Sequence, residues 1–183
     1  EDLSEVVALA PEHVSAYALT YEERTPFHQW RARGTITPLS EEIEEEMFRN
    51  VRLTLAAGGY EPYEISSFAR PGYHSRHNRN YLNGTDYLGL GAGAHSYVAE
   101  GWGRRWVNRR NPQQYTMAVM REGSARAESE TLTREQAMTE AVFLALRQAG
   151  GLDSAAFARR FGEEVVTSFP AVADLCREGL LET

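Results

Sequence analysis

The stretch of sequence that decides the fold is residues 60–97, YEPYEISSFARPGYHSRHNRNYLNGTDYLGLGAGAHSY. It combines two kinds of group that binding sites need. His77, Asn78 and Tyr81 are polar side chains, two of them rings, within five residues of sequence. The run GLGAGAH, from Gly89 to His95, is nearly bare backbone, which suits the close approach of a ligand. A hydrophobic core alone rarely requires both kinds of group, so this stretch predicts a site.

An alternation of helix and strand patterns precedes this stretch and favours an α/β fold. Residues 2–10 have helical apolar spacing that Pro11 ends, and residues 13–20 alternate and are rich in β-formers, which predicts a strand. Residues 25–34 predict a short helix. Residues 40–59 predict a longer helix, because an apolar stripe of period 3.6 runs between a serine cap and a glycine pair. A strand is expected at 60–65.

The pattern becomes irregular after residue 70, and irregular backbone beside strand ends is where α/β proteins place ligands. Short strands are expected at 95–98 and 104–107, a helix at 112–121, and a polar linker at 122–131. Further helices are expected at 133–149, about 153–161 and 169–178. We therefore expect two domains, at residues 1–121 and 122–183.

Composition narrows the classes of function. The chain has 183 residues, 42% of them hydrophobic and 25% charged, which is ordinary for a globular protein. No apolar run approaches the roughly 18 residues of a membrane span, and the N-terminus lacks the order of a signal peptide. We expect a soluble, cytoplasmic protein. A net charge of −7 argues against nucleic acid or anionic membrane as partner. With Cys176 as its one cysteine, the chain alone forms no disulfide and no all-cysteine metal site.

Four motifs together carry a family resemblance. They are YEISSFARPG at 63–72, HNRNY at 77–81, DYLGLG at 86–91 and GAHS at 93–96. This combination resembles the later half of the radical-SAM proteins related to oxygen-independent coproporphyrinogen III oxidase, and is most similar to the HemW-type heme chaperones. The resemblance covers essentially all of the chain. It implies the C-terminal part of a (β/α) barrel, then a small, truncated, winged-helix-like helical domain. Because that domain is net acidic, we expect a packing or partner module and not a DNA-binding one.

The resemblance also implies a function for the intact protein. Members of the chaperone branch bind heme and deliver it to acceptor proteins. Two alternatives stay open: an oxidase that decarboxylates coproporphyrinogen III by SAM radical chemistry, and a purely structural docking module. The family's [4Fe–4S] cluster is held by three cysteines in a CxxxCxxC motif that this chain lacks. We therefore expect a C-terminal segment, with SAM and the cluster held by the intact protein, and leave open whether that protein is an enzyme.

His77, Asn78 and Tyr81 match the family's HNxxYW motif, which the resemblance associates with heme. Imidazole is a natural axial ligand of heme iron. His77 is accordingly the expected iron ligand, with a structural role that pins the loop as the alternative, and nearby His74 as a possible substitute ligand. Leu82 stands where the family usually has Trp, which puts an aromatic stacking contact in doubt.

Further contacts are expected from the resemblance and from charge. Leu19, Thr20, Ala94 and His95 fall near positions where the related oxidase contacts SAM, with packing at the barrel rim as the alternative. Arginines are grouped beside two tryptophans, at Arg104, Arg105, Arg109 and Arg110. Guanidinium groups pair well with carboxylates, so Arg109 and Arg110 are expected to bind porphyrin propionates, against the alternative of a solvated strand edge.

A homodimer is also expected. An isolated barrel portion exposes strand edges and apolar surface, both of which favour association. Light scattering that shows a monomer at high concentration would count against this expectation.

Overall fold

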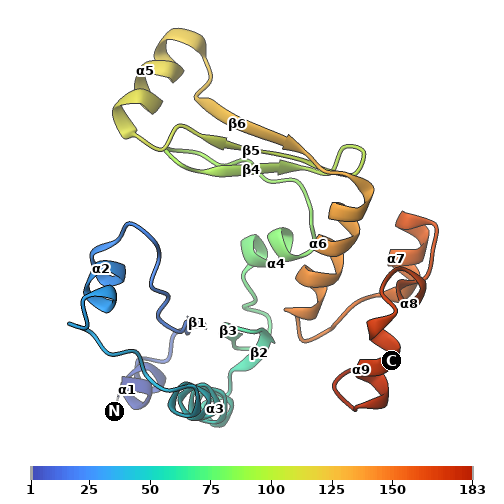
Figure 1. The fold of residues 1–183 in the computed structure, drawn as a ribbon. Coiled ribbons are helices and arrows are strands. Elements are labelled where there is room, and N and C mark those ends of the chain that lie inside the picture. The colour runs from blue at the N-terminus through green and yellow to red at the C-terminus, as the bar shows by residue number, and fades with distance from the viewer. Residues whose placement is uncertain (1, 183) are drawn as a thin grey trace. The chain divides into compact units, whose positions relative to one another are not determined.

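Residues 2–182 are described by a computed structural model, in which the chain divides between Ser75 and Arg76 into two units (Figure 1). Each unit has its own three-stranded antiparallel sheet and its own helices. The mixed α/β class expected from the sequence is confirmed. The expected domain boundary at 121/122 stays a prediction.

The first unit is built around the sheet β1-β3-β2. Its elements are α1 (Asp2–Leu9), β1 (His13–Ser15), α2 (Pro26–Ala32), α3 (Glu41–Ala57), β2 (Glu61–Glu64) and β3 (Ser67–Ala69). Leu55 near the end of α3 is buried against Tyr60 and Phe68, because the apolar stripe of this helix turns toward the sheet. The three expected helices are therefore confirmed, as is the strand that follows them.

The expected strand at 13–20 is wrong beyond Ser15. Residues 16–20 have no regular structure, although Ala16 still donates its N–H to the carbonyl of Ser66 at 2.8 Å. β3 has only three residues, and its register pairs Ser15 with Ser67 as the last partners. The alternating pattern of the sequence continues beyond this point, but no strand partner does.

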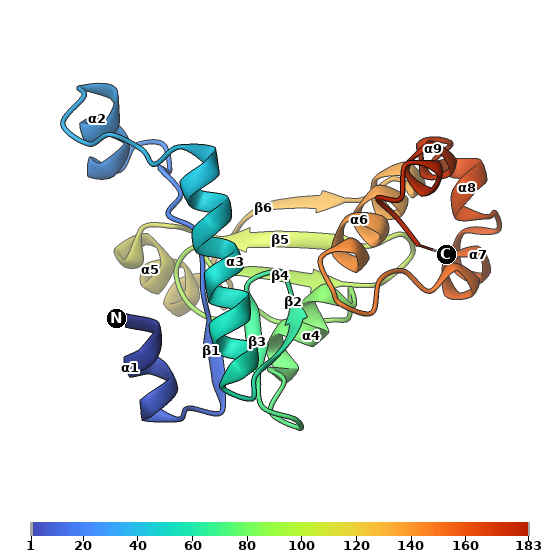
Figure 2. The ribbon, with the colours of Figure 1, turned by 90° about the horizontal axis from the view of Figure 1, so that it is seen from below.

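The second unit pairs a β4-β5-β6 sheet with a set of helices. Its elements are α4 (Arg76–Leu82), β4 (His95–Val98), β5 (Arg104–Asn108), α5 (Pro112–Glu122), β6 (Arg126–Thr131), α6 (Arg134–Leu146), α7 (Ser154–Phe161), α8 (Val165–Ser168) and α9 (Ala171–Arg177). Figure 2 shows α5 and α6 at opposite ends of the sheet. The strands at 95–98 and 104–107 and the helices after them are confirmed.

The expected polar linker at 122–131 is wrong, because β6 occupies most of it. β6 pairs antiparallel with β5, with Arg105 opposite Glu130 and Trp106 opposite Ser129. All six of its residues are exposed, so the alternation of apolar and polar residues that marks a half-buried strand is missing. Cross-strand pairs take the place of burial: the Arg126 guanidinium lies 4.2 Å from the centre of the Trp106 ring.

Helix capping and a shared hydrophobic core connect the sheet of the second unit to its helices. Thr133 and Gln136 form a reciprocal capping box at the start of α6, and Asp153 caps α7. The buried residues of this core come from β4, the end of β6 and three helices: Tyr97, Leu132, Ala137, Met138, Phe157, Phe161 and Val165. The helices after β6 are thus packed directly onto the sheet of this unit.

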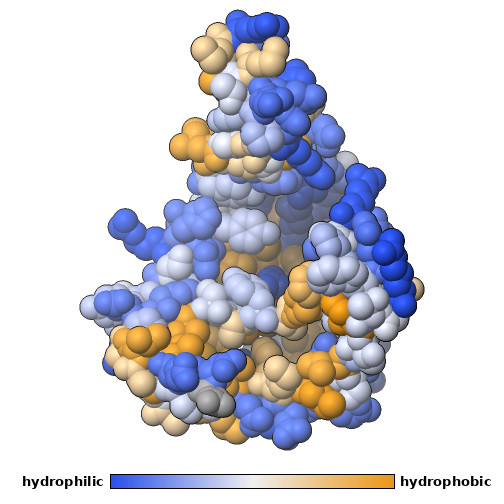
Figure 3. Space-filling model, turned by 90° about the vertical axis from the view of Figure 1, so that its left-hand side faces the viewer, coloured by the Kyte–Doolittle hydropathy of each residue, from blue (hydrophilic) through white to orange (hydrophobic). Residues whose placement is uncertain are grey.

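Hydrophobic residues are exposed as well as buried. Helix α3 exposes Ile43, Met47, Phe48 and Leu53, and Figure 3 shows orange residues between blue ones on one face of the molecule. The homodimer expected from the sequence stays a prediction. No helix within residues 2–182 is long and apolar enough to cross a membrane.

Candidate functional site

Helix α4 is the element that positions the expected heme residues, in a segment that sequence patterns left irregular. His77 and Tyr81 are four residues apart, so the helix brings both to one side, one turn from each other. Both are exposed, and Tyr81 retains 48% of its accessible surface. Asn78 is partly buried. The Tyr81 ring meets the edge of Tyr87 at 5.9 Å, and Tyr87 stacks on Tyr97 at 6.1 Å.

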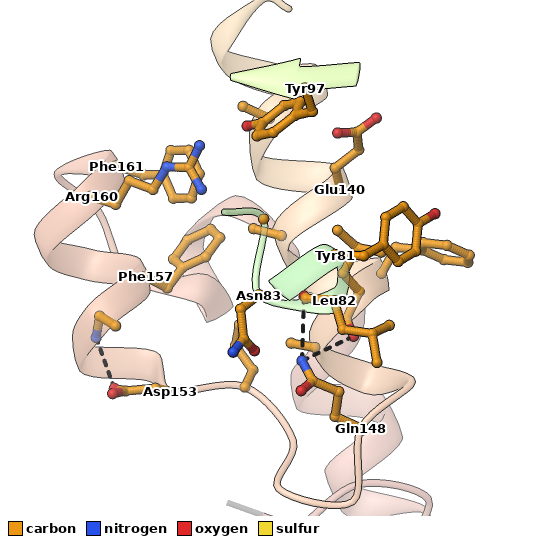
Figure 4. Close-up of a pocket in the computed structure, with 18 of the residues that line it drawn as sticks. Tyr81, Leu82, Asn83, Tyr97, Glu140, Gln148, Asp153, Phe157, Arg160 and Phe161 are labelled. Atoms are coloured by element: carbon orange, nitrogen blue, oxygen red, sulfur yellow. Dashed lines mark hydrogen bonds between the residues drawn. The ribbon is translucent and has the colours of Figure 1, made fainter. Parts of the chain in front are cut away.

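A groove of about 920 Å³ lies on the Tyr81 side of α4, between β4 and helices α6 and α7 (Figure 4). Much of its wall is aromatic: Tyr81, Tyr87, Tyr97, Phe143, Phe157 and Phe161. Seven polar or charged side chains line the rest, namely Asn83, His95, Arg105, Glu140, Gln148, Asp153 and Arg160. Ligand pockets are typically about 300–1,000 Å³, mostly apolar, with a small number of polar groups. This groove therefore has the size of a ligand site, with aromatic side chains and several polar groups in its wall.

Leu82 belongs to the wall of this groove. Its side chain is only 6% exposed, and its carbonyl accepts a hydrogen bond from Nε2 of Gln148 at 3.4 Å. Tyr87 also lines this groove and is partly buried. Burial is the largest cause that raises the pKa of its phenol. The phenol is therefore neutral near pH 7. The position after Tyr81 thus packs against the C-terminal helices in this chain.

A second depression, of about 590 Å³, lies beside α4 and is polar. It is lined by Arg76, His77, Arg79, Asn80 and Asn83. Asn80 holds the end of the helix, since its carbonyl accepts from the backbone N–H and the hydroxyl of Thr85 at 3.0 and 2.9 Å. His77 lines this polar depression, whereas Tyr81 lines the aromatic groove. Helix α4 therefore separates an apolar site from a basic one.

The glycine run packs against its own sheet. The Gly89 N–H donates to Oγ of buried Ser96 at 2.9 Å, and Nδ2 of Asn108 donates to the Gly89 and Gly91 carbonyls at 3.2 and 3.0 Å. A Cβ on Gly89 would lie 2.1 Å from the backbone oxygen of His95. At this position the close approach that glycine permits is to the protein's own backbone.

The residues expected near SAM lie in different surroundings. The Ala94 carbonyl accepts from the Asn108 N–H at 3.0 Å, and His95 is exposed at the start of β4, where it lines the aromatic groove. Leu19 and Thr20 are exposed in the irregular segment of the first unit. Contact of these four residues with SAM stays a prediction.

The arginines near β5 divide into two kinds. Arg104 pairs with Glu100 at 3.4 Å, and Arg105 pairs with Glu130 at 2.7 Å and with Glu140. The hydrogen bond to Glu130 is the largest cause that raises the pKa of Arg105. These two guanidinium groups tie β5 to its neighbours.

Arg109 and Arg110 follow the end of β5, beside the glycine run. Arg109 accepts from the Gly93 N–H at 3.1 Å through its carbonyl, and its Nε is buried without a hydrogen-bond partner among the described residues. Arg110 is exposed. Binding of propionates by this pair stays a prediction.

His74 lies in the first unit and is stacked on Tyr63, with ring centres 4.5 Å apart. Its Nε2 is buried and has no hydrogen-bond partner within the part of the chain that the structure describes. Tyr63 in turn contacts Nε2 of His13 through its hydroxyl at 2.9 Å. This packing supports a structural role for His74, and its use as a substitute iron ligand stays a prediction.

Between residues 2 and 182, no group of three or more His, Cys, Asp or Glu side chains is arranged to hold a metal ion. Cys176 on α9 is the chain's one cysteine. A cluster that needs three thiolates therefore does not fit the residues of this chain.

Comparison with known proteins defines the class of protein. Residues 132–183 match the HemN C-terminal domain family. The fold matches that of coproporphyrinogen III oxidase (HemN) from Escherichia coli, a radical SAM enzyme. The TM-score is 0.73, the match covers 99% of this chain and 44% of that chain, and the two are 20% identical. The chain therefore has the fold of the C-terminal α/β part of a radical-SAM protein.

Sequence relatives narrow the class further. The chain is 33% identical over 180 residues to the heme chaperone HemW of Bacillus subtilis, covering 98% of this chain and 47% of that protein. It is 33% identical over 160 residues to HemW of Lactococcus lactis, covering 87% of this chain and 41% of the relative. The chain thus spans about half the length of the curated relatives it matches. The chain is therefore similar to the HemW-type group of the coproporphyrinogen III oxidase-like radical-SAM family, and its residues 132–183 match the C-terminal domain of that family.

Proposed function

We propose that this chain is the heme-binding C-terminal part of a heme chaperone, with heme as the cargo. The observation that carries the proposal is the arrangement on α4. This helix exposes His77 and Tyr81 one turn apart, and the aromatic groove opens on the side of Tyr81. The relatives named above are heme chaperones, which supports the same cargo here.

The chemistry of these residues fits heme. An exposed neutral imidazole is a good axial ligand for iron, and His77 is exposed. A flat aromatic macrocycle gains from contact with aromatic side chains, and Tyr81 and Tyr87 meet at the edge of the groove. Asn78, partly buried beside His77, holds the local backbone in this proposal.

The rest of the activity belongs to the intact protein in this proposal. There, SAM and a [4Fe–4S] cluster are bound, and heme passes to an acceptor protein in the cytoplasm. A single iron ligand on an exposed helix suits a cargo that must be released. Fewer contacts give weaker binding, and among related complexes weaker binding appears mostly as faster dissociation. No step is assigned to the cluster, since this chain's residues do not fit it.

The test is a hemin titration of this chain, followed by absorbance in the Soret region. We expect saturable one-to-one binding that falls by about tenfold or more in His77→Ala, the loss of one ligand bond being worth at least about 1.4 kcal/mol. His28→Ala, on α2 of the first unit, is the matched control, and His74→Ala tests the substitute ligand. Circular dichroism checks that each variant is folded.

Two results would overturn the proposal. One is the absence of saturable binding by the unaltered chain, which would favour the structural docking module. The other is equal binding by the His77→Ala and His28→Ala variants. Separately, decarboxylation of coproporphyrinogen III by the full-length protein would favour the oxidase over the chaperone.

A further inference from the structure

The basic depression beside α4 contains positive charge without a counter-charge. Its lining is two arginines, one histidine and two asparagines, with no acidic residue among them. Neither Arg76 nor Arg79 has a carboxylate within 4.0 Å among the described residues. The whole chain carries a net charge of −7, so an acid-free pair of arginines contrasts with its surroundings.

Some arginines of the same unit pair with carboxylates, unlike Arg76 and Arg79. Arg105 pairs with Glu130 and Glu140, and Arg134 pairs with Glu163. These guanidinium groups join elements of the fold and are already satisfied. Arg76 and Arg79 are exposed and join nothing in this way, so their charge is free to meet an anion.

The order of side chains around α4 places this charge beside the iron ligand of the proposed function. Arg76, Arg79, Asn80 and Asn83 follow the spacing i, i+3, i+4, i+7, which makes one polar stripe along the helix and its end. At about 100° per residue, His77 lies between this stripe and Tyr81. Going around α4, the cationic stripe is therefore followed by the His77 imidazole, then by the Tyr81 ring and then by the aromatic groove.

We propose that Arg76 and Arg79 bind the propionate carboxylates of the porphyrin. This inference rests on the proposed function, and it assigns the carboxylate contacts to a pair of arginines different from Arg109 and Arg110. Heme has an apolar macrocycle with two carboxylates on one edge, so its polarity matches that of α4. Arginine suits such carboxylates because its planar fork donates two parallel hydrogen bonds. The Asn80 and Asn83 amides add neutral donors beside it.

The test compares hemin with hemin dimethyl ester, which has the same iron and macrocycle but no ionised carboxylate. An Arg76→Gln/Arg79→Gln double variant should bind hemin about tenfold more weakly, a modest effect because exposed ion pairs are screened by solvent. Its affinity for the dimethyl ester should stay within about threefold of the unaltered chain. An Arg109→Gln/Arg110→Gln double variant is the matched rival and should bind hemin normally.

Three results of the hemin comparison would overturn the inference. These are unchanged hemin affinity in Arg76→Gln/Arg79→Gln, an equal loss for hemin and its ester, or a selective loss of hemin in the Arg109 and Arg110 variant. A further experiment titrates the chain with inorganic phosphate. Tight binding of phosphate in the depression, without competition with hemin, would assign the site to phosphate and would also overturn the inference. Failure of the proposed function looks different: hemin would then bind nowhere, or would bind without His77.

Discussion

Alanine in place of Gly89 should destabilise the second unit severely, although it adds only one methyl group. The new Cβ would lie 2.1 Å from the His95 carbonyl oxygen and 2.8 Å from its nitrogen. Both are backbone atoms of the first residue of β4, so no flexible side chain can move aside. The loop or the strand must shift to relieve the contact.

The size of the effect follows from the hydrogen bonds that such a shift breaks. The Gly89 N–H donates to Oγ of Ser96, which is 0% exposed, and the Gly89 carbonyl accepts from Asn108. A net hydrogen bond contributes about 1 kcal/mol, and a buried polar group left unpaired costs about 1–3 kcal/mol. We expect a loss of about 2–4 kcal/mol in the free energy of unfolding, or about 4–16 °C in Tm for a chain of this length.

Gly150→Ala is the matched control. A Cβ there would have nothing within 4 Å, and its φ lies outside the positive range. Its Tm should be unchanged or slightly raised, because alanine reduces the entropy of the unfolded chain. Urea and thermal unfolding of both variants, followed by circular dichroism, measure the difference. A Gly89→Ala variant as stable as Gly150→Ala would refute this account of the glycine run.

Two further predictions concern stability. Phe157→Ala should lower the free energy of unfolding by about 3–5 kcal/mol in urea titrations, because Phe157 is 3% exposed in the core. Phe143→Ala, at 58% exposure, should cost far less, and equal losses would contradict the core. In acid, the hydrogen bond from Arg134 is the largest cause that lowers the pKa of Glu163 from 4.5. The stabilisation is therefore present above about pH 4.5 and is lost as pH falls below it. The Tm difference between the unaltered chain and Glu163→Gln should shrink from pH 7 to pH 3, and a constant difference would argue against the pair.

Much of the helical structure followed from local sequence. Thr133 with Gln136, and Asp153 before α7, cap their helices through contacts within three residues, so the signal and the structure share one short segment. The motif that contains His77 and Tyr81 was noticed through its resemblance to a family pattern, and no helix was expected there. The spacing of His77 and Tyr81 places them one turn apart on any helix, and α4 is such a helix.

The sequence patterns gave the wrong result for strands whose extent depends on a neighbouring strand. β6 has no apolar alternation and is a strand because β5 supplies its hydrogen-bond partners. The strand expected at 13–20 ends at Ser15 because β3 ends with it. Both outcomes depend on contacts with a distant segment, which periodicity does not record.

The sequence by itself predicted the family resemblance, the α/β class and the motif that contains His77 and Tyr81, because these depend on residue identity and spacing. Tertiary structure decided which arginines have partners. Arg105 meets Glu140, 35 positions away, and this pairing separates it from Arg76 and Arg79. It also decided that the glycine run packs on β4 and that Leu82 lines a groove. The physical reason is that burial and ion pairing are relations between distant residues, whereas helix spacing and capping are relations between neighbours in the chain.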